Sequence, residues 1–291
     1  MVTTRTTRRG VIALGAVALA GCTSSGGNGD DEPTDDDPGN EDEPSETDEL
    51  NRNLPERDIE PAWDEAAPFR PWLLDSTHNR RFDYTAVFPE EADPAAQLPD
   101  FFDVATDDLD GHLIQTESQV FLGSFDVESI ANGAEASDEY EFSGHYEGYA
   151  VVEPTGSEAS VPHEIAVGSE AIVLGADYEA RIDARLGEHE RLEEVDSEFT
   201  HLFRELPYET TVTAQYDSPM GGSMEDVYIW GVASESPTAE TMTWVFVLRE
   251  DPSEDVLEEL ESVSDDVEES ELDGRTATVV GAPPEMPAYD E

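Results

Sequence analysis

Apolar side chains recur at intervals of three and four residues in four segments, a spacing that places them on one face of an α-helix. The segments that we expect to be helical are 127–134, 178–186, 199–206 and 256–263. Asp177 precedes the second segment and is expected to cap its N-terminus. The fourth follows residues 251–254, Asp-Pro-Ser-Glu, which have the pattern of a capping box with proline at the first helical position.

Eight other segments are rich in β-branched and aromatic residues, and we expect them to be strands. They are 119–125, 149–152, 164–167, 171–174, 211–216, 227–232, 242–248 and 275–280. Large apolar residues occupy alternate positions from Met242 to Leu248, as in a strand with one buried face. Because helices and strands are interleaved, the sequence predicts one α+β body with about three to five helices, rather than a doubly wound nucleotide-binding fold.

Two stretches, 120–152 and 245–280, have the same order of expected features. Each begins with a strand, continues through an aspartate-capped helix and an acidic loop, and ends with a glycine-led strand. This similarity predicts two similar halves, 82–175 and 176–291. The alternative is that ordinary alternation of strands and helices produces the same order without a duplication.

The chain carries far more acidic than basic side chains. Its 291 residues include 71 Asp and Glu against 14 basic residues, a formal net charge of −57, and every basic residue is arginine. Such a charge repels itself at ordinary ionic strength but is largely screened in molar salt. The composition resembles that of proteins from extremely halophilic archaea. Because the chain has no basic stripe, we expect it not to bind nucleic acid.

The first 22 residues have the layout of an export signal. Arginines are followed by ten apolar residues, and the only cysteine, Cys22, ends the segment. Ten apolar residues are too few for a membrane-spanning helix. Residues 7–12, with Arg8 and Arg9, resemble the twin-arginine export motif, and residues 19–22 resemble a lipobox. The segment is therefore similar to the signals of haloarchaeal lipoproteins that are exported in the folded state.

This resemblance implies that residues 1–21 are a signal peptide and that Cys22 carries lipid. The membrane is then a partner through that lipid, and the expected location is the extracellular face of the cell membrane. Residues 22–51 are mostly Gly, Ser, Pro, Asp and Glu, a composition that predicts an acidic, disordered tether. The globular domain is expected to span residues 52–291.

Residues 106–117 match part of the calcium-loop pattern. Asp108, Asp110 and Glu117 occupy three of the ligand positions, but Thr106 stands at the first, and a strand is expected where the pattern requires a helix. The segment is therefore either a calcium site or a solvated acidic turn. No other cofactor is expected.

Arg70, Arg80 and Arg81 lie close together in a segment that also holds four large aromatic residues. In so acidic a chain, these arginines could bind a carboxylate ligand or a partner surface. The alternative is that they pair with acids of the chain itself, while the aromatic residues pack the edge of the core.

The histidines offer no metal-binding spacing. His189 and His201 are expected to be exposed, whereas His145 and His163 are expected in loops, where they could converge. We therefore expect a lipid-anchored cell-surface protein without enzymatic activity, in a binding or envelope accessory role. Its partner would be a cell-envelope protein or a small ligand. The alternatives are an exported hydrolase that uses loop histidines and carboxylates, and the ligand-binding component of a transporter.

Overall fold

The computed structural model describes residues 54, 57–75, 81–156, 159–217, 224, 226–253 and 255–284. The expected signal peptide (1–21) and tether (22–51) lie outside the described residues, and so do Arg8, Arg9, Cys22 and Arg80. None of the helices in the described ranges is long and apolar enough to cross a membrane.

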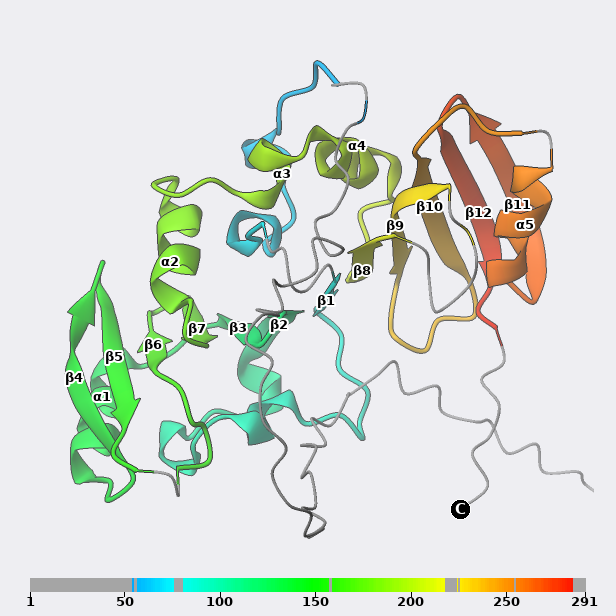
Figure 1. Cartoon of the computed structure of the whole chain (residues 1–291). Helices are drawn as coiled ribbons and strands as arrows, with labels where there is room; N and C mark the ends of the chain where they lie inside the picture. Colours follow the sequence, from blue (N-terminus) through cyan, green and yellow to red (C-terminus); the bar gives the residue numbers. More distant parts are fainter. Residues whose placement is uncertain are drawn as a thin grey trace, which may run out of the picture.

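The described strands form a twelve-stranded sheet with antiparallel pairing and the order β11-β12-β10-β9-β8-β1-β2-β3-β7-β6-β5-β4 (Figure 1). The strands are β1 (Arg81–Thr85), β2 (Leu109–Gln115), β3 (Ser118–Gly123), β4 (Tyr140–Tyr146), β5 (Tyr149–Pro154), β6 (Ile165–Val167), β7 (Ala171–Leu174), β8 (Thr211–Tyr216), β9 (Val227–Ser234), β10 (Met242–Leu248), β11 (Asp266–Asp273) and β12 (Thr276–Ala282). The helices are α1 (Val127–Ala136), α2 (Tyr178–Leu186), α3 (Leu192–Val195), α4 (Ser197–Glu205) and α5 (Val256–Leu260). Short 3₁₀ helices are η2 (Trp63–Glu65), η3 (Arg70–Trp72), η4 (Pro94–Gln97), η5 (Asp100–Phe102), η6 (Thr106–Asp108) and η7 (Glu261–Val263). The fold class is therefore α+β, as expected.

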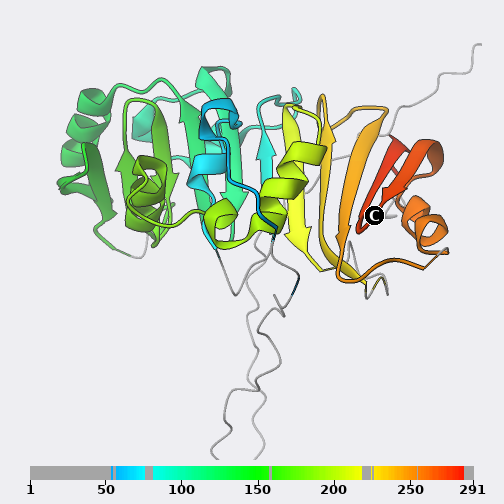
Figure 2. The same ribbon diagram turned by 90° about the horizontal axis from the view of Figure 1, so that it is seen from above.

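Two groups of elements have the same connectivity. The first is β1-β2-β3-α1-β4-β5 and the second is β8-β9-β10-α5-β11-β12. The strands β6 and β7 are an addition to the first group, inserted between β3 and β5 in the sheet. At the centre, β1 pairs with β8 in antiparallel register, with Asp83 opposite Thr213. An antiparallel pair has local two-fold symmetry, so the two groups extend from this pair in opposite directions (Figure 2). A common ancestry of the two halves stays a prediction.

The acidic loops expected in both stretches are in fact strands. The loop of the first stretch is β4 and that of the second is β11, and these two strands lie at the two ends of the sheet. Along most of β11, exposed acidic side chains alternate with the half-buried side chains of Val267, Ser270 and Leu272. Charged side chains on an edge strand hinder pairing with another chain, but they also remove the apolar signal by which a strand is recognised.

The apolar side chains of the sheet separate into cores on its two faces. The central core lies beneath α2, α3, α4 and η3, and it takes Val120, Val173 and Val245 from the strands. Their sequence neighbours Phe121, Ile172 and Phe246 belong to two cores on the opposite face, one under α1 and one under α5. Neighbouring residues of a strand point to opposite faces, so this arrangement follows from the period of two in each strand.

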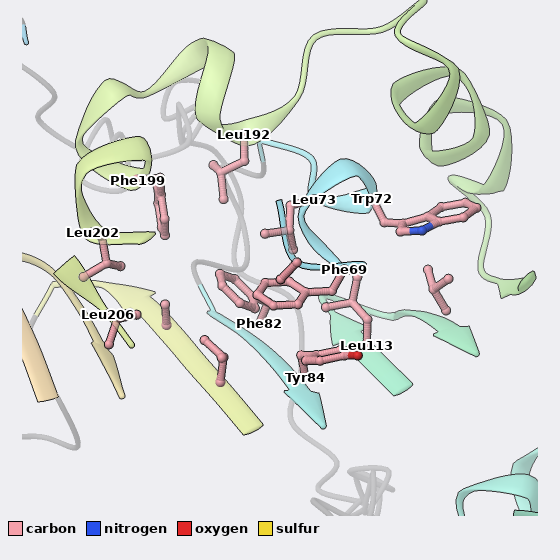
Figure 3. Close-up of a cluster of buried hydrophobic side chains, with 14 of the residues drawn as sticks. Phe69, Trp72, Leu73, Phe82, Tyr84, Leu113, Leu192, Phe199, Leu202 and Leu206 are labelled. Atoms are coloured by element: carbon pink, nitrogen blue, oxygen red, sulfur yellow. The ribbon is translucent and has the colours of Figure 1, made fainter. Parts of the chain in front are cut away.

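Aromatic rings fill the middle of the central core (Figure 3). Phe69 stacks on Tyr84 with ring centroids 4.5 Å apart, and Phe82 lies 5.7 Å from Phe69. Phe203, on α4, completes the group at 5.8 Å from both Phe69 and Phe82. Helix α4 packs close to β9 at Gly231, where an added Cβ would lie 2.8 Å from a methyl group of Leu206.

Arg181 of α2 is buried with 1% of its surface exposed. Its guanidinium donates to the carbonyl oxygen of Trp72 (3.1 Å) and to the side-chain and main-chain oxygens of Gln115 (2.9 and 3.2 Å). Asp177, one turn earlier, forms an ion pair with it at 2.9 Å. Arg181 therefore joins α2, η3 and β2. Asp177 stands at the N-cap position of α2, as expected, but its side chain makes no capping hydrogen bond.

The other expected helices are confirmed, but α5 begins later than the expected capping box before it. Helix α4 covers 197–205 and α1 begins after Asp126, whose side chain accepts a hydrogen bond from the main-chain nitrogen of Ser129. Helix α5 begins at Val256, after Asp255, and not at the proline of the expected capping box. Glu254, the last residue of that box, lies outside the described residues.

Candidate functional site

Five of the nine described arginines gather on the side of the sheet that α3 and α4 cover. We call this group the arginine face, and it consists of Arg57, Arg70, Arg191, Arg204 and Arg275. They come from three parts of the chain, the segment before β1, the α3–α4 region and the turn before β12, and they meet around two glutamates, Glu193 of α3 and Glu198 of α4. In a chain with 71 acidic residues, a local group of five arginines distinguishes this part of the surface from the rest.

Both glutamates are buried and bound by arginines. The Glu193 carboxylate, 1% exposed, accepts from Nε and Nη2 of Arg70 at 2.7 and 2.6 Å. Burial raises the pKa of Glu193, and the charges of Arg70, Arg191 and Arg204 oppose that rise. Glu198 accepts from Arg57 and from Arg275, each at 2.5 Å. These pairs hold α3 and α4 against the segment before β1 and against β12.

Trp63 lies between two of these arginines. The guanidinium carbon of Arg191 is 4.4 Å from the centre of the Trp63 ring, and that of Arg70 is 5.7 Å away. The Arg191 guanidinium donates to the carbonyl oxygens of Ala184 and Arg185. Contacts of cations with aromatic faces stabilise such an arrangement by about 0.5–2 kcal/mol each. Trp63 thus fixes the outer wall of the arginine face.

A cavity of about 390 Å³ opens between η2, η3 and the C-terminal end of α4. Its floor is apolar, with Phe69, Phe203, Leu206 and Val212 among the lining residues. Tyr208 also lines it and is 76% exposed, the highest value among the exposed large hydrophobic residues described. Ligand pockets have volumes of about 300–1,000 Å³, so this cavity falls within the size range of a small-molecule site.

Arg204 lines the same cavity and is exposed. Its Nη2 donates to the carbonyl oxygen of Glu60 at 2.5 Å. Within the described ranges, its guanidinium forms no ion pair with a carboxylate, whereas Arg57, Arg70 and Arg275 each do. Arg204 therefore has guanidinium hydrogens available at the mouth of the cavity.

A second cavity, of about 550 Å³, lies on the other side of α4, against the β11–β12 hairpin. There His201 Nε2 is 2.7 Å from Oγ1 of Thr276, and His201 Nδ1 is 3.7 Å from a carboxylate oxygen of Glu205. Only 13% of the His201 side chain is exposed, so the expectation of an exposed His201 is wrong. Burial lowers the pKa of His201, which favours the neutral ring.

The structure separates the arginines that the sequence grouped together. Arg70 lies on the arginine face and pairs with Glu193. Arg81 belongs to β1, where it neighbours the core residue Phe82 and therefore points to the opposite face, and it pairs with Asp83 at 2.8 Å. Arg70 and Arg81 thus do not form one binding cluster, while Arg80 lies outside the described residues.

The calcium-loop candidates are also separated. Asp108 ends η6, Asp110 lies in β2, and Glu117 lies in the turn after β2, so Asp108 and Glu117 are at opposite ends of a seven-residue strand. A loop that gathers ligands around one ion does not form here. Among the described residues, no group of three or more His, Cys, Asp or Glu side chains is placed to hold a metal ion.

The remaining histidines stay apart. His145 lies within β4, not in a loop, and is opposite Ala150 of β5. His163 precedes β6, whose Ile165 is opposite Val152 of β5. Strand β5 therefore lies between the two histidines, and they lie toward opposite ends of β5. They do not converge. His189 is exposed, as expected.

Comparisons with known proteins leave the family open. No family model matches the chain, and no curated protein matches it. Among solved structures, the chain is similar to crystal form III and crystal form IV of TP0453, each with a TM-score of 0.41 and 8% identical residues. The matches cover 75% and 76% of this chain and 95% of the other chain.

Proposed function

We propose that this chain is a lipid-anchored binding protein on the extracellular face of a halophile's membrane, without enzymatic activity. The observation that carries the binding role is the cavity beside Tyr208, where an apolar floor meets the guanidinium of Arg204, which forms no ion pair with a carboxylate among the described residues. The anchoring rests on the sequence around Arg8, Arg9 and Cys22. In this proposal the tether of residues 22–51 holds the cavity-bearing domain away from the membrane surface.

The anchor is tested by replacing Cys22 with alanine. We expect the wild-type protein to sediment with membranes and to be released by detergent, because its anchor is a lipid. The Cys22→Ala protein is expected to appear in the soluble or secreted fraction. Ser25→Ala, three residues further along, is the matched control and should behave as wild type. Cell fractionation at molar salt measures this, and equal sedimentation of the Cys22→Ala and wild-type proteins would contradict the anchor.

An exported hydrolase is the second candidate, favoured by the arrangement of Thr276, His201 and Glu205. A hydroxyl bound to a neutral imidazole, with a carboxylate oxygen 3.7 Å from the other ring nitrogen, has the order of groups in a nucleophilic triad. Thr276 Oγ1 would bond to the carbonyl carbon of an ester while its proton passes to His201 Nε2. The alcohol would then leave with that proton, and water would release the acid from Thr276.

Ester hydrolysis separates the two candidates. The hydrolase predicts turnover of p-nitrophenyl acetate in molar salt, reduced at least about 100-fold by Thr276→Val and by His201→Gln. Thr278→Val is the control, since Thr278 lines the same cavity without a hydrogen bond to His201. The binding protein predicts equal, background rates for wild type and all three variants.

A further inference from the structure

The cavity beside Tyr208 holds charges of both signs around its apolar floor. Besides Arg204, its charged lining residues are Glu65, Glu209 and Arg70, of which Arg70 is neutralised by its pair with Glu193. Neither the Glu65 nor the Glu209 side chain forms a hydrogen bond or an ion pair with the described residues. The cavity therefore offers a guanidinium and two carboxylates that are not neutralised by one another.

The apolar floor specifies the body of the ligand. Phe203 is half-buried at the floor, and Phe69 supports it with ring centroids 5.8 Å apart in an edge-to-face arrangement. Leu206 and Val212 extend the floor toward β8. A planar or branched apolar group of a few carbons fits such a surface and gains about 25 cal/mol for each Å² removed from water.

The charged side chains of Arg204, Glu65 and Glu209 specify the polar groups of the ligand. A guanidinium binds a carboxylate through two parallel hydrogen bonds, and a glutamate accepts from an ammonium group. A ligand that satisfies both and fills the floor carries a carboxylate, an ammonium group and an apolar side chain. We propose that the cavity binds a free apolar or aromatic amino acid, with its carboxylate at Arg204 and its ammonium group at Glu209 or Glu65. This inference rests on the proposed binding function and names the ligand class for that site.

Three probes with one ring system test the charges separately. L-Tryptophan has both charges, N-acetyl-L-tryptophan lacks the ammonium group, and L-tryptophanamide lacks the carboxylate. Ligand-observed saturation-transfer NMR in molar salt gives the Kd of each probe for the full-length protein. We expect L-tryptophan to bind at least about tenfold more tightly than either analogue, since each loses a charged hydrogen bond.

The variants locate the site. Arg204→Gln should weaken L-tryptophan and N-acetyl-L-tryptophan about 10- to 100-fold and leave L-tryptophanamide unchanged. Tyr208→Ala should weaken all three probes, because they share the ring. Arg185→Gln is the control: Arg185 is a half-buried arginine of α2 that pairs with Glu170 at 3.5 Å and does not line the cavity. Arg204 and Tyr208 are exposed, so neither replacement is expected to unfold the protein.

Equal binding of the three probes, or no effect of Arg204→Gln, would overturn the proposal. Binding of N-acetyl-L-tryptophan as tight as that of L-tryptophan would also overturn it, because the site would then take a carboxylate such as a peptide C-terminus. Absence of binding by every probe would overturn it as well. The Cys22 experiment is independent of these results, so a failed ligand class and a failed anchor are told apart.

Discussion

Replacing Arg181 by methionine is expected to lower the free energy of unfolding by about 3–5 kcal/mol. The replacement fills the space but removes the guanidinium donor from the carbonyl oxygen of Trp72 and from both oxygens of Gln115, and the side-chain oxygen of Gln115 keeps only its hydrogen bond from Leu74. Gln115 in turn holds Leu74 through two hydrogen bonds, at 3.1 and 2.8 Å. The loss should therefore loosen the segment that carries Phe69 and Arg70 into the arginine face.

Urea unfolding in molar salt measures this change. Arg185→Met is the matched control, because Arg185 lies one turn further along α2 with 39% of its side chain exposed and pairs with Glu170 at 3.5 Å. Exposed pairs of this kind contribute at most about 1 kcal/mol. Equal losses in the two variants would show that Arg181 does not join α2, η3 and β2 in the way described.

Transfer from about 3 M to about 0.1 M salt is expected to lower the free energy of unfolding by about 5 kcal/mol or more. The Debye length grows from below about 3 Å to about 10 Å over this change, so the excess acidic charges begin to repel one another. The 71 acidic residues greatly outnumber the 14 arginines that could pair with them. Buried pairs such as Glu193 with Arg70 are screened less and do not compensate.

Thermal unfolding followed by circular dichroism measures the effect, and a fall in Tm of about 10–20 °C is expected. Sucrose at low salt is the control, because it strengthens hydrophobic burial without screening charge. Complete recovery of the melting temperature in sucrose would assign the effect to burial instead. A melting temperature that does not change with salt would contradict the screening argument.

Most strands with buried side chains were predictable from the sequence, but the central strands β1 and β2 and the edge strands β4 and β11 were not. The segments 171–174 and 211–216 were predicted with the bounds that the structure shows, because β-branched and apolar residues fill them. Strand β11 has the sequence DVEESELD and packs few of its side chains, so its composition is that of a loop. Strand β2 was missed because its acidic start matched a calcium-loop pattern. The local pattern carries no information about pairing with distant strands, and pairing makes β2 and β11 strands.

The candidate site was predicted only in part. Arg70 was noticed because aromatic residues surround it in sequence, but it was grouped with Arg81, which lies on the other face of the sheet. Its partner Glu193 is 123 positions away, and Arg204 belongs to a helix whose apolar face was the stronger signal. The one local sign of the cavity was Tyr208, a large aromatic residue directly after that helix, and its exposure depends on the tertiary packing of α4.

In this proposal, the cavity beside Tyr208 binds its ligand through Arg204 of the arginine face. A crystal structure of the protein grown in molar salt and soaked with L-tryptophan tests it most directly. We expect ordered density for the indole ring against Phe203, with the carboxylate on Arg204. An empty cavity at a tryptophan concentration well above the Kd measured in solution, or density bound elsewhere on the protein, would contradict it.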